Sequence, residues 1–167
     1  DIVPNHMGVM GADNAWWLDV LENGEASIYA DFFDIDWQPL NRALQGRVLI
    51  PVLGEHYGLV LERGELKLAY DESDGGISLW YFTHRFPIDP STYPIVLERA
   101  MHLAPTQTLG EDAHTELASL IAAFAHLPRR DHQDTTARSE RRRDTALLKR
   151  RLAGLLSSNA ALREGLD

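Results

Sequence analysis

The 167-residue sequence contains no cysteine, which excludes disulfide bridges, thiolate metal sites and a cysteine nucleophile. It also lacks a run of about 18 consecutive apolar residues, so it predicts no membrane-spanning helix. The first residues carry neither a basic start nor the apolar stretch of a secretion signal. These absences suit a reducing compartment, and a cytoplasmic location is our expectation.

Several motifs of metal binding and catalysis are absent as well. The seven histidines are scattered, and no His-Glu-x-x-His segment occurs. No glycine-rich phosphate loop follows a strand, and there is no Gly-x-Ser-x-Gly elbow. The sequence therefore predicts no metal, no cofactor and no serine-hydrolase site.

Basic residues are scarce in the first 128 positions, which hold 6 Lys and Arg against 19 Asp and Glu. Residues 129–151 reverse the balance, with 9 against 4. Such a helix is able to bind phosphates or anionic lipid, but its interspersed acids favour a solvated face packed beside an acidic body. We therefore expect neither nucleic acid nor a membrane as partner. The side chains assigned to that face are Arg138, Arg141, Arg142 and Arg143, with Glu140 and Asp144 among them.

The start of the chain predicts a fragment of a longer protein. A natural chain begins with Met, whereas this one opens on Asp1-Ile-Val-Pro4, which is typical of the end of a buried strand. A strand without its parallel neighbours leaves backbone donors and acceptors unpaired. We therefore expect the isolated chain to self-associate through Ile2 and Val3.

Strand and turn signals fill the first hundred residues. Asp13 or Asn14 is a suitable cap for a helix over residues 15–22, which Gly24 ends, and a second short turn runs from Ser27 to Phe32. The apolar run 47–53 predicts a buried strand, and residues 54–64 frame a short helix. Alternating apolar positions predict a β-hairpin over 65–82, whose turn, 71–76, we expect to be exposed and tolerant of insertions.

Helical spacing dominates the rest of the chain. Ser91 or Thr92 is expected to cap a helix that runs towards Pro105. Apolar stripes predict further helices over 112–126 and 135–156, and a short one over 160–166. Because strands precede helices, the predicted fold class is α+β.

Two clusters in the early region permit more than one interpretation. Six aromatic residues are either core groups, which we favour, or a surface on which a sugar stacks. The carboxylates of Asp34 and Asp36 are spaced to lie on one face of a strand, and paired carboxylates perform glycoside transfer, although a solvated strand edge is the more common outcome. The aromatic set is Trp16, Trp17, Tyr29, Phe32, Phe33 and Trp37.

One heptapeptide and four longer segments resemble a known enzyme family. The heptapeptide Asp1-Ile-Val-Pro-Asn-His-Met7 resembles the first sequence region shared by the α-amylase superfamily, glycoside hydrolase family 13. Together with the other segments it is similar to maltooligosyl trehalose synthases, strongly over residues 1–100 and more weakly beyond. Those segments are Asp13 to Gly24, Tyr29 to Trp37, Leu49 to Gly58 and His84 to Pro90.

The resemblance implies a (β/α)8-barrel enzyme whose third strand ends at residues 1–7, on the face that carries the active site. It implies that His6 hydrogen-bonds the sugar where the bond is cleaved, that Asn5 supports this loop without holding calcium, and that Asp1 braces the strand end. Without the resemblance, all three are ordinary loop residues. Four further residues in the matching segments are expected to line the substrate pocket or to make structural hydrogen bonds: His56, Tyr57, His84 and Arg85.

The resemblance also implies an absence. The family's three catalytic carboxylates follow later barrel strands, and no Arg-x-Asp nucleophile segment occurs here. We therefore expect no catalytic residue in this chain, which comprises a strand end at 1–7, a mixed α/β insertion at 8–104 and a helical segment at 105–167. Its expected partners are a maltooligosaccharide or α-1,4-glucan and the remainder of its own barrel.

The implied reaction rebuilds the reducing-end α-1,4 linkage of a maltooligosaccharide as α,α-1,1 by intramolecular transglucosylation. Two alternatives stay open. One is an α-amylase-type hydrolase or another transglucosidase of the superfamily, and the other is a non-catalytic glucan-binding module.

Overall fold

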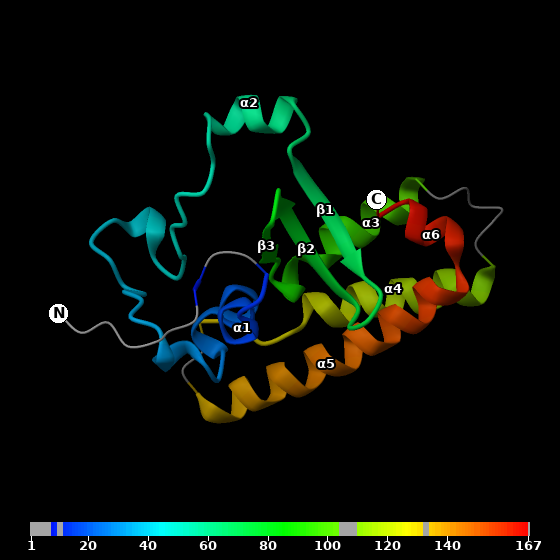
Figure 1. Ribbon diagram of the computed structural model, residues 1–167. Coiled ribbons are helices and arrows are strands. Elements are labelled where there is room, and N and C mark those ends of the chain that lie inside the picture. Colours follow the sequence, from blue (N-terminus) through cyan, green and yellow to red (C-terminus); the bar gives the residue numbers. More distant parts are fainter. Residues whose placement is uncertain (1–7, 10–11, 104–109, 132–133, 167) are drawn as a thin grey trace.

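The computed structural model describes residues 8–9, 12–103, 110–131 and 134–166 (Figure 1). This part of the chain forms a small antiparallel sheet with helices around it, which confirms the α+β class. The helix α5 runs beneath the sheet, whereas α2 stands apart from the other helices at the opposite side of the picture. The helices are α1 (Ala15–Asn23), α2 (Tyr57–Glu62), α3 (Tyr93–Leu103), α4 (Glu111–Ala125), α5 (Thr135–Ser158) and α6 (Ala160–Glu164), and the strands are β1 (Leu66–Asp71), β2 (Gly76–Tyr81) and β3 (His84–Pro87).

The sheet has the order β1-β2-β3, with both pairs antiparallel. The register of the first pair runs from Leu66 opposite Tyr81 to Asp71 opposite Gly76, so the predicted hairpin is confirmed. The third strand, which the sequence pattern did not predict, pairs Ser78 with Pro87. It has only four residues and ends in a proline, which leaves too little alternation for a strand signal.

The hairpin turn is less exposed to solvent than predicted. Glu72 and Ser73 are exposed, but Gly75 and Gly76 are buried, and Gly75 has a positive φ of 74°. A Cβ atom on Gly75 would lie 2.7 Å from the carbonyl carbon of Lys149 in α5 and closer still to its oxygen. The expectation of an exposed turn is therefore wrong for its second half, because α5 passes directly against it.

The main core joins the four C-terminal helices to β2. Leu117, Leu120 and Phe124 form the buried stripe of α4, at the spacing that the sequence predicted. The buried hydroxyl of Tyr93 in α3 accepts a hydrogen bond from the Ile77 backbone N–H at 2.8 Å, which fixes α3 against β2. Burial raises the pKa of this tyrosine well above its ordinary value. The other buried members of the core are Leu97, Ala100, Leu127, Leu148, Leu152, Leu156, Leu162 and Leu166.

The N-terminal helix begins and ends as predicted. The Asn14 side chain accepts a hydrogen bond from Trp17 N at 3.1 Å, and Gly24 ends α1 with a positive φ of 58°. The start of α3 differs from the prediction, because Asp89 accepts from Ser91 N and caps a 3₁₀ turn, Pro90–Thr92, that leads into the helix. Neither Ser91 nor Thr92 is the cap.

Residues 47–53 form no strand, so that prediction is wrong. The backbone has no ladder partner within the described residues, and the side chain of Leu49 is 72% exposed. Pro51 supplies no N–H group, and Val52 N bonds locally to Ile50 O instead of to another strand. The apolar run is therefore an extended surface segment here.

The aromatic cluster divides between core and surface. Trp17 is buried and packs against Phe33, with ring centroids 5.1 Å apart. Trp16 is 49% exposed and stacks on Tyr29 at an interplanar angle of 7°, and Phe32 is 68% exposed. The core interpretation is therefore confirmed for Trp17 and wrong for Trp16 and Phe32.

Candidate functional site

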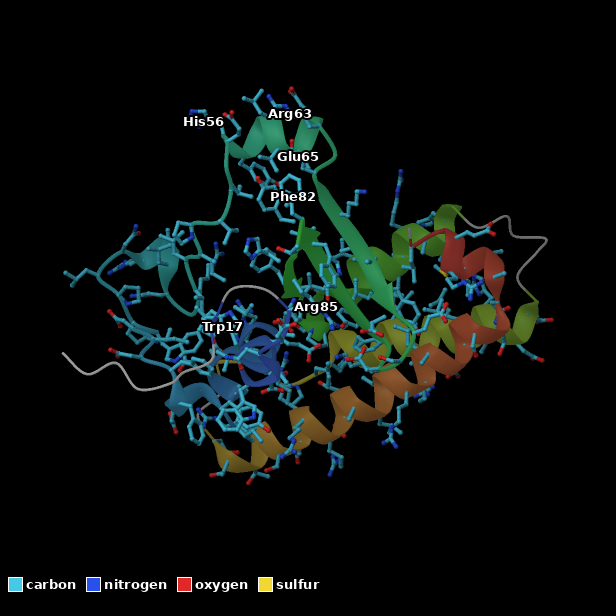
Figure 2. All side chains as sticks on the ribbon, viewed as in Figure 1. Trp17, His56, Arg63, Glu65, Phe82 and Arg85 are labelled. Carbon is cyan, nitrogen blue, oxygen red and sulfur yellow. The ribbon has the colours of Figure 1, made fainter. Side chains whose placement is uncertain are left out.

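Three of the predicted site residues, Asp1, Asn5 and His6, lie outside the described residues. Their roles stay predictions. The other four belong to two separate places on the molecule, and Figure 2 shows His56 beside the beginning of the projecting helix α2, apart from Arg85 on β3. The structure therefore does not assemble these residues into one pocket.

His56 and Tyr57 stand at the beginning of α2 and are exposed. His56 is the residue before the helix, and its side chain caps no backbone N–H group. The Tyr57 side chain is 62% exposed. Both side chains are therefore accessible to a ligand or to another part of a longer protein.

Arg85 is held by three groups of the sheet. Its Nε donates to Ser78 Oγ at 2.9 Å, and its Nη2 lies 3.4 Å from Asp71 Oδ2. The guanidinium also lies over the Trp80 ring, 5.9 Å from its centroid. Hydrogen bonds from the side chain and backbone of Ser73, helped by the charge of Arg85, lower the pKa of Asp71. These contacts give Arg85 a structural role that joins all three strands.

His84 differs from Arg85 in having an unused polar atom. Its Nδ1 is buried without a hydrogen-bond partner among the described residues, and its ring lies 6.3 Å from the Phe86 ring. A buried imidazole nitrogen without a partner loses its hydration and gains nothing in return. The atom is therefore a candidate acceptor or donor for a group outside the described part of the chain.

Two hollows meet at Arg85, and we call them together the Arg85 cleft. The first, of about 270 Å³, is lined by α1, the hairpin turn and Lys149, and the second, of about 370 Å³, by β1 and Trp80. Ser78 and Arg85 line both. The cleft thus places a guanidinium and a hydroxyl between two walls rich in carboxylates.

The first wall contains a buried ion pair. Lys149 Nζ in α5 lies 2.6 Å from Glu22 Oε1 in α1, and both side chains are mostly buried. Burial raises the pKa of Glu22, an effect that the neighbouring charge of Lys149 only partly offsets. A carboxyl group with a raised pKa is suited to proton donation, but the Lys149 contact occupies this one and ties α1 to α5. We regard it as a structural pair.

The acids that the sequence singled out for glycoside transfer lie elsewhere. Asp34 and Asp36 are exposed and belong to no strand. Asp36 Oδ1 accepts from the backbone N–H of Gln38 at 3.0 Å. Their exposure fits the interpretation that they are solvated surface acids and not a catalytic pair.

Asp89, in the same segment as His84 and Arg85, is the centre of a second charged network. Arg141 donates to Asp89 Oδ1 at 2.7 Å and to the backbone oxygen of Pro128 at 2.6 Å, and Arg130 Nε lies 3.7 Å from Asp89 Oδ2. Burial by itself would raise the pKa of Asp89, but the charge and hydrogen bond of Arg141 outweigh it and lower that pKa. Arg141 is only 1% exposed, so its assignment to a solvated helix face is wrong.

Asp89 was not among the predicted site residues, although it stands in the segment from His84 to Pro90 that carries part of the resemblance. An acid between an isoleucine and a proline was a usable signal, because that position is suited to a cap. Nothing in the local pattern marked Arg141 as its partner, 52 residues away.

The part of the chain that the structure describes contains neither a metal site nor a membrane span. No group of acidic or histidine side chains there is arranged to hold a metal ion. None of the helices there has the length and apolar character that a membrane span needs.

Comparison with known proteins supports the resemblance over part of the chain. Two curated proteins of Mycobacterium tuberculosis, from strains CDC 1551 and H37Rv, each bear the name "Putative maltooligosyl trehalose synthase" and are 53% identical to this chain over 55 residues. The match covers 32% of this chain and 7% of the length of each relative. No family model and no solved structure matches the chain. The similarity to maltooligosyl trehalose synthases is thus confirmed for these 55 residues.

Proposed function

We propose that this chain is part of an enzyme that converts the reducing-end α-1,4 linkage of a maltooligosaccharide into an α,α-1,1 linkage. The observation that carries the proposal is the 53% identity over 55 residues to two proteins named "Putative maltooligosyl trehalose synthase". The segments that resemble such enzymes support it. In this proposal, residues 1–7 end the third strand of a (β/α)8 barrel, and the rest forms an insertion that walls the glucan cleft.

The proposed reaction moves a glucosyl bond without consuming water. The α-1,4 bond to the terminal glucose breaks, the leaving oxygen takes a proton, and a carboxylate of the enzyme holds the maltooligosyl unit covalently. The released glucose then attacks with its anomeric hydroxyl, which returns the proton and frees the carboxylate. A wall that excludes water favours this transfer over hydrolysis. We assign no bond-breaking carboxylate to this chain.

His6 is the proposed sugar-binding residue of the chain, and Asn5 and Asp1 support its loop. Replacing His6 with alanine in the full-length enzyme should lower kcat/KM by on the order of 10²-fold, because a contact that orients a hydroxyl strengthens in the transition state. Steady-state kinetics with maltopentaose measure this. Replacing His114, an exposed histidine at the beginning of α4, is the matched control and should leave the kinetics unchanged. Unaltered kcat/KM in the His6 variant would remove His6 from the site.

Product analysis of the full-length protein tests the reaction class. Maltopentaose should lose its reducing ends while its five glucosyl units stay together, because the reducing-end glucose becomes a non-reducing trehalosyl end. An amylase-type hydrolase would instead create new reducing ends and shorter glucans. A protein that binds maltopentaose and leaves it unchanged would favour the binding-module alternative.

A further inference from the structure

A second cleft lies away from the predicted site residues, and we call it the Glu25 cleft. It has a volume of about 340 Å³, within the range of small-molecule sites, roughly 300–1,000 Å³. Its walls come from four parts of the chain: the short turn Gly24–Ala26, residues 45–47, the 3₁₀ turn that Asp89 caps, and the connection between α4 and α5. Six charged side chains line it: Glu25, Arg47, Asp89, Arg129, Arg130 and Asp131.

Arg130 fixes these four walls relative to one another. Its backbone oxygen accepts from Ala26 N at 3.0 Å, and its side chain lies against Gly24, where a Cβ atom would be 3.2 Å from the arginine Cδ. The guanidinium donates to Gly46 O at 3.3 Å and lies 3.7 Å from Asp89. The cleft is therefore a shape built by the fold and not a gap between independent loops.

Glu25 has no partner in this cleft. The residue is only 7% exposed, and its carboxylate makes no hydrogen bond or ion pair with any described residue, although its oxygens are not fully buried and keep contact with solvent in the cleft. The hydrogen-bond acceptors of this carboxylate are therefore open to water or to a ligand in the cleft. A ligand with hydroxyl groups is able to replace that water as the donor.

The three acidic and the three basic side chains of the cleft balance in formal charge, and four of these six side chains form ion pairs. Arg129 donates to both oxygens of Asp131, at 3.0 and 2.8 Å, and Arg130 lies beside Asp89. Arg47, which is exposed, makes no ion pair with a described carboxylate. An unpartnered acceptor, Glu25, and an available donor, Arg47, thus line one hollow.

This balance of charges indicates which chemical class of ligand fits the cleft. An anion would be repelled by the buried carboxylate of Glu25, and a cation by the three guanidinium groups. A neutral polyhydroxylated molecule satisfies both, because each hydroxyl donates a hydrogen bond to a carboxylate or accepts one from a guanidinium. We propose that the Glu25 cleft binds one or two glucosyl units of an α-1,4-glucan, with Glu25 accepting from sugar hydroxyls and Arg47 donating to them.

The polyol chemistry follows from the cleft itself, whereas the choice of a glucan rests on the proposed function. The site is distinct from the loop of His6 and contributes binding rather than bond cleavage. A single shallow saccharide site of this kind should have a Kd on the order of 1–10 mM, since it offers few contacts.

The test is a titration of the chain with maltotriose, followed by two-dimensional amide NMR. Signals of residues 24–26, 45–47 and 129–131 should shift, and the Glu25→Met variant should weaken binding at least about ten-fold, because methionine has a similar size and accepts no strong hydrogen bond. The same variant should have a Tm no lower than that of the wild-type chain, since it replaces a mostly buried acidic residue that has no ion-pair partner with an apolar one of similar size. Glu62→Met, at an exposed position of α2, is the matched control and should bind maltotriose like the wild type.

Three results would overturn the inference: shifts that map elsewhere, Glu25→Met binding maltotriose as well as the wild type, or inorganic phosphate binding the cleft more tightly than maltotriose. Comparison with myo-inositol separates the two parts of the inference, because equal binding of both polyols would disprove the glucan assignment. Product analysis of the full-length enzyme does not depend on this cleft. Failure of the proposed function and failure of the cleft are therefore distinguishable.

Discussion

Replacing Gly75 with alanine should destabilise the chain by about 3 kcal/mol or more, and this is the largest effect that we expect from adding one methyl group. The residue has φ of 74°, a conformation that L side chains rarely adopt. The new Cβ would also overlap the backbone of Lys149, and a helix backbone does not move aside as a side chain does. The hairpin would have to separate from α5. Chemical denaturation followed by circular dichroism measures the change.

Two other glycines distinguish the cost of the strained backbone conformation from the cost of the overlap with α5. Gly64 has a φ of 65°, but nothing lies within 4 Å of the position of its Cβ, so Gly64→Ala should cost about 1 kcal/mol from backbone strain alone. Gly58 has neither a positive φ nor a close neighbour, and in α2 its replacement by alanine should be neutral or slightly stabilising. Equal stabilities of the Gly75 and Gly64 variants would mean that the hairpin does not pack against α5 as described.

Replacing Asp89 with asparagine should cost about 3 kcal/mol of stability at neutral pH. Asparagine keeps the size and the capping oxygen that accepts from Ser91 N, so the substitution removes mainly the charge. It leaves Arg141, 1% exposed, without its anionic partner. Asp144→Asn is the matched control, because its partner, Arg143, is exposed, and it should change stability by less than about 1 kcal/mol.

The effect of Asp89→Asn should depend on pH in one direction. The pKa of Asp89 is lowered in the folded chain, so the folded state binds a proton less readily than the unfolded state. The stabilisation is therefore fully present above the unfolded-state pKa of about 3.9 and is lost as the pH falls through the folded-state value. Wild-type and variant stabilities should differ most near pH 6 and converge below about pH 4. A difference that stays constant down to pH 3 would contradict the role of the charge.

The sequence predicted the elements whose signals are local. Asn14 caps α1 and Gly24 ends it, as their residue types indicate, because capping depends on the few backbone groups beside the cap. The hairpin β1-β2 and the helices α4, α5 and α6 follow from apolar periods of two and 3.6, which each segment carries within itself. The resemblance to maltooligosyl trehalose synthases was likewise visible in the sequence, and the 53% identity over 55 residues supports it for part of the chain.

Features that depend on distant partners were missed. The apolar run 47–53 has strand composition, but a strand needs a neighbour, and the described residues provide none. Arg141 stands in a helix of mostly polar residues, where only the position of Asp89, 52 residues earlier, shows that it is buried. Glu25 lies in a three-residue turn, and its burial without a partner becomes visible only once Arg130 closes the cleft.

The most direct test of the account is whether this chain, alone, acts on a glucan. Cleavage of a glucosidic bond needs a proton donor and an opposed carboxylate, about 5–5.5 Å apart in retaining enzymes. We assign neither role to a residue of this chain, because Glu22 is held by Lys149 and Asp34 and Asp36 are exposed surface acids. Purified chain incubated with maltopentaose, followed by chromatography, should return the maltopentaose unchanged. Maltotriosyl trehalose or shorter glucans in turnover-level amounts, lost on replacing Asp34 or Asp36, would show that the active site lies within this chain.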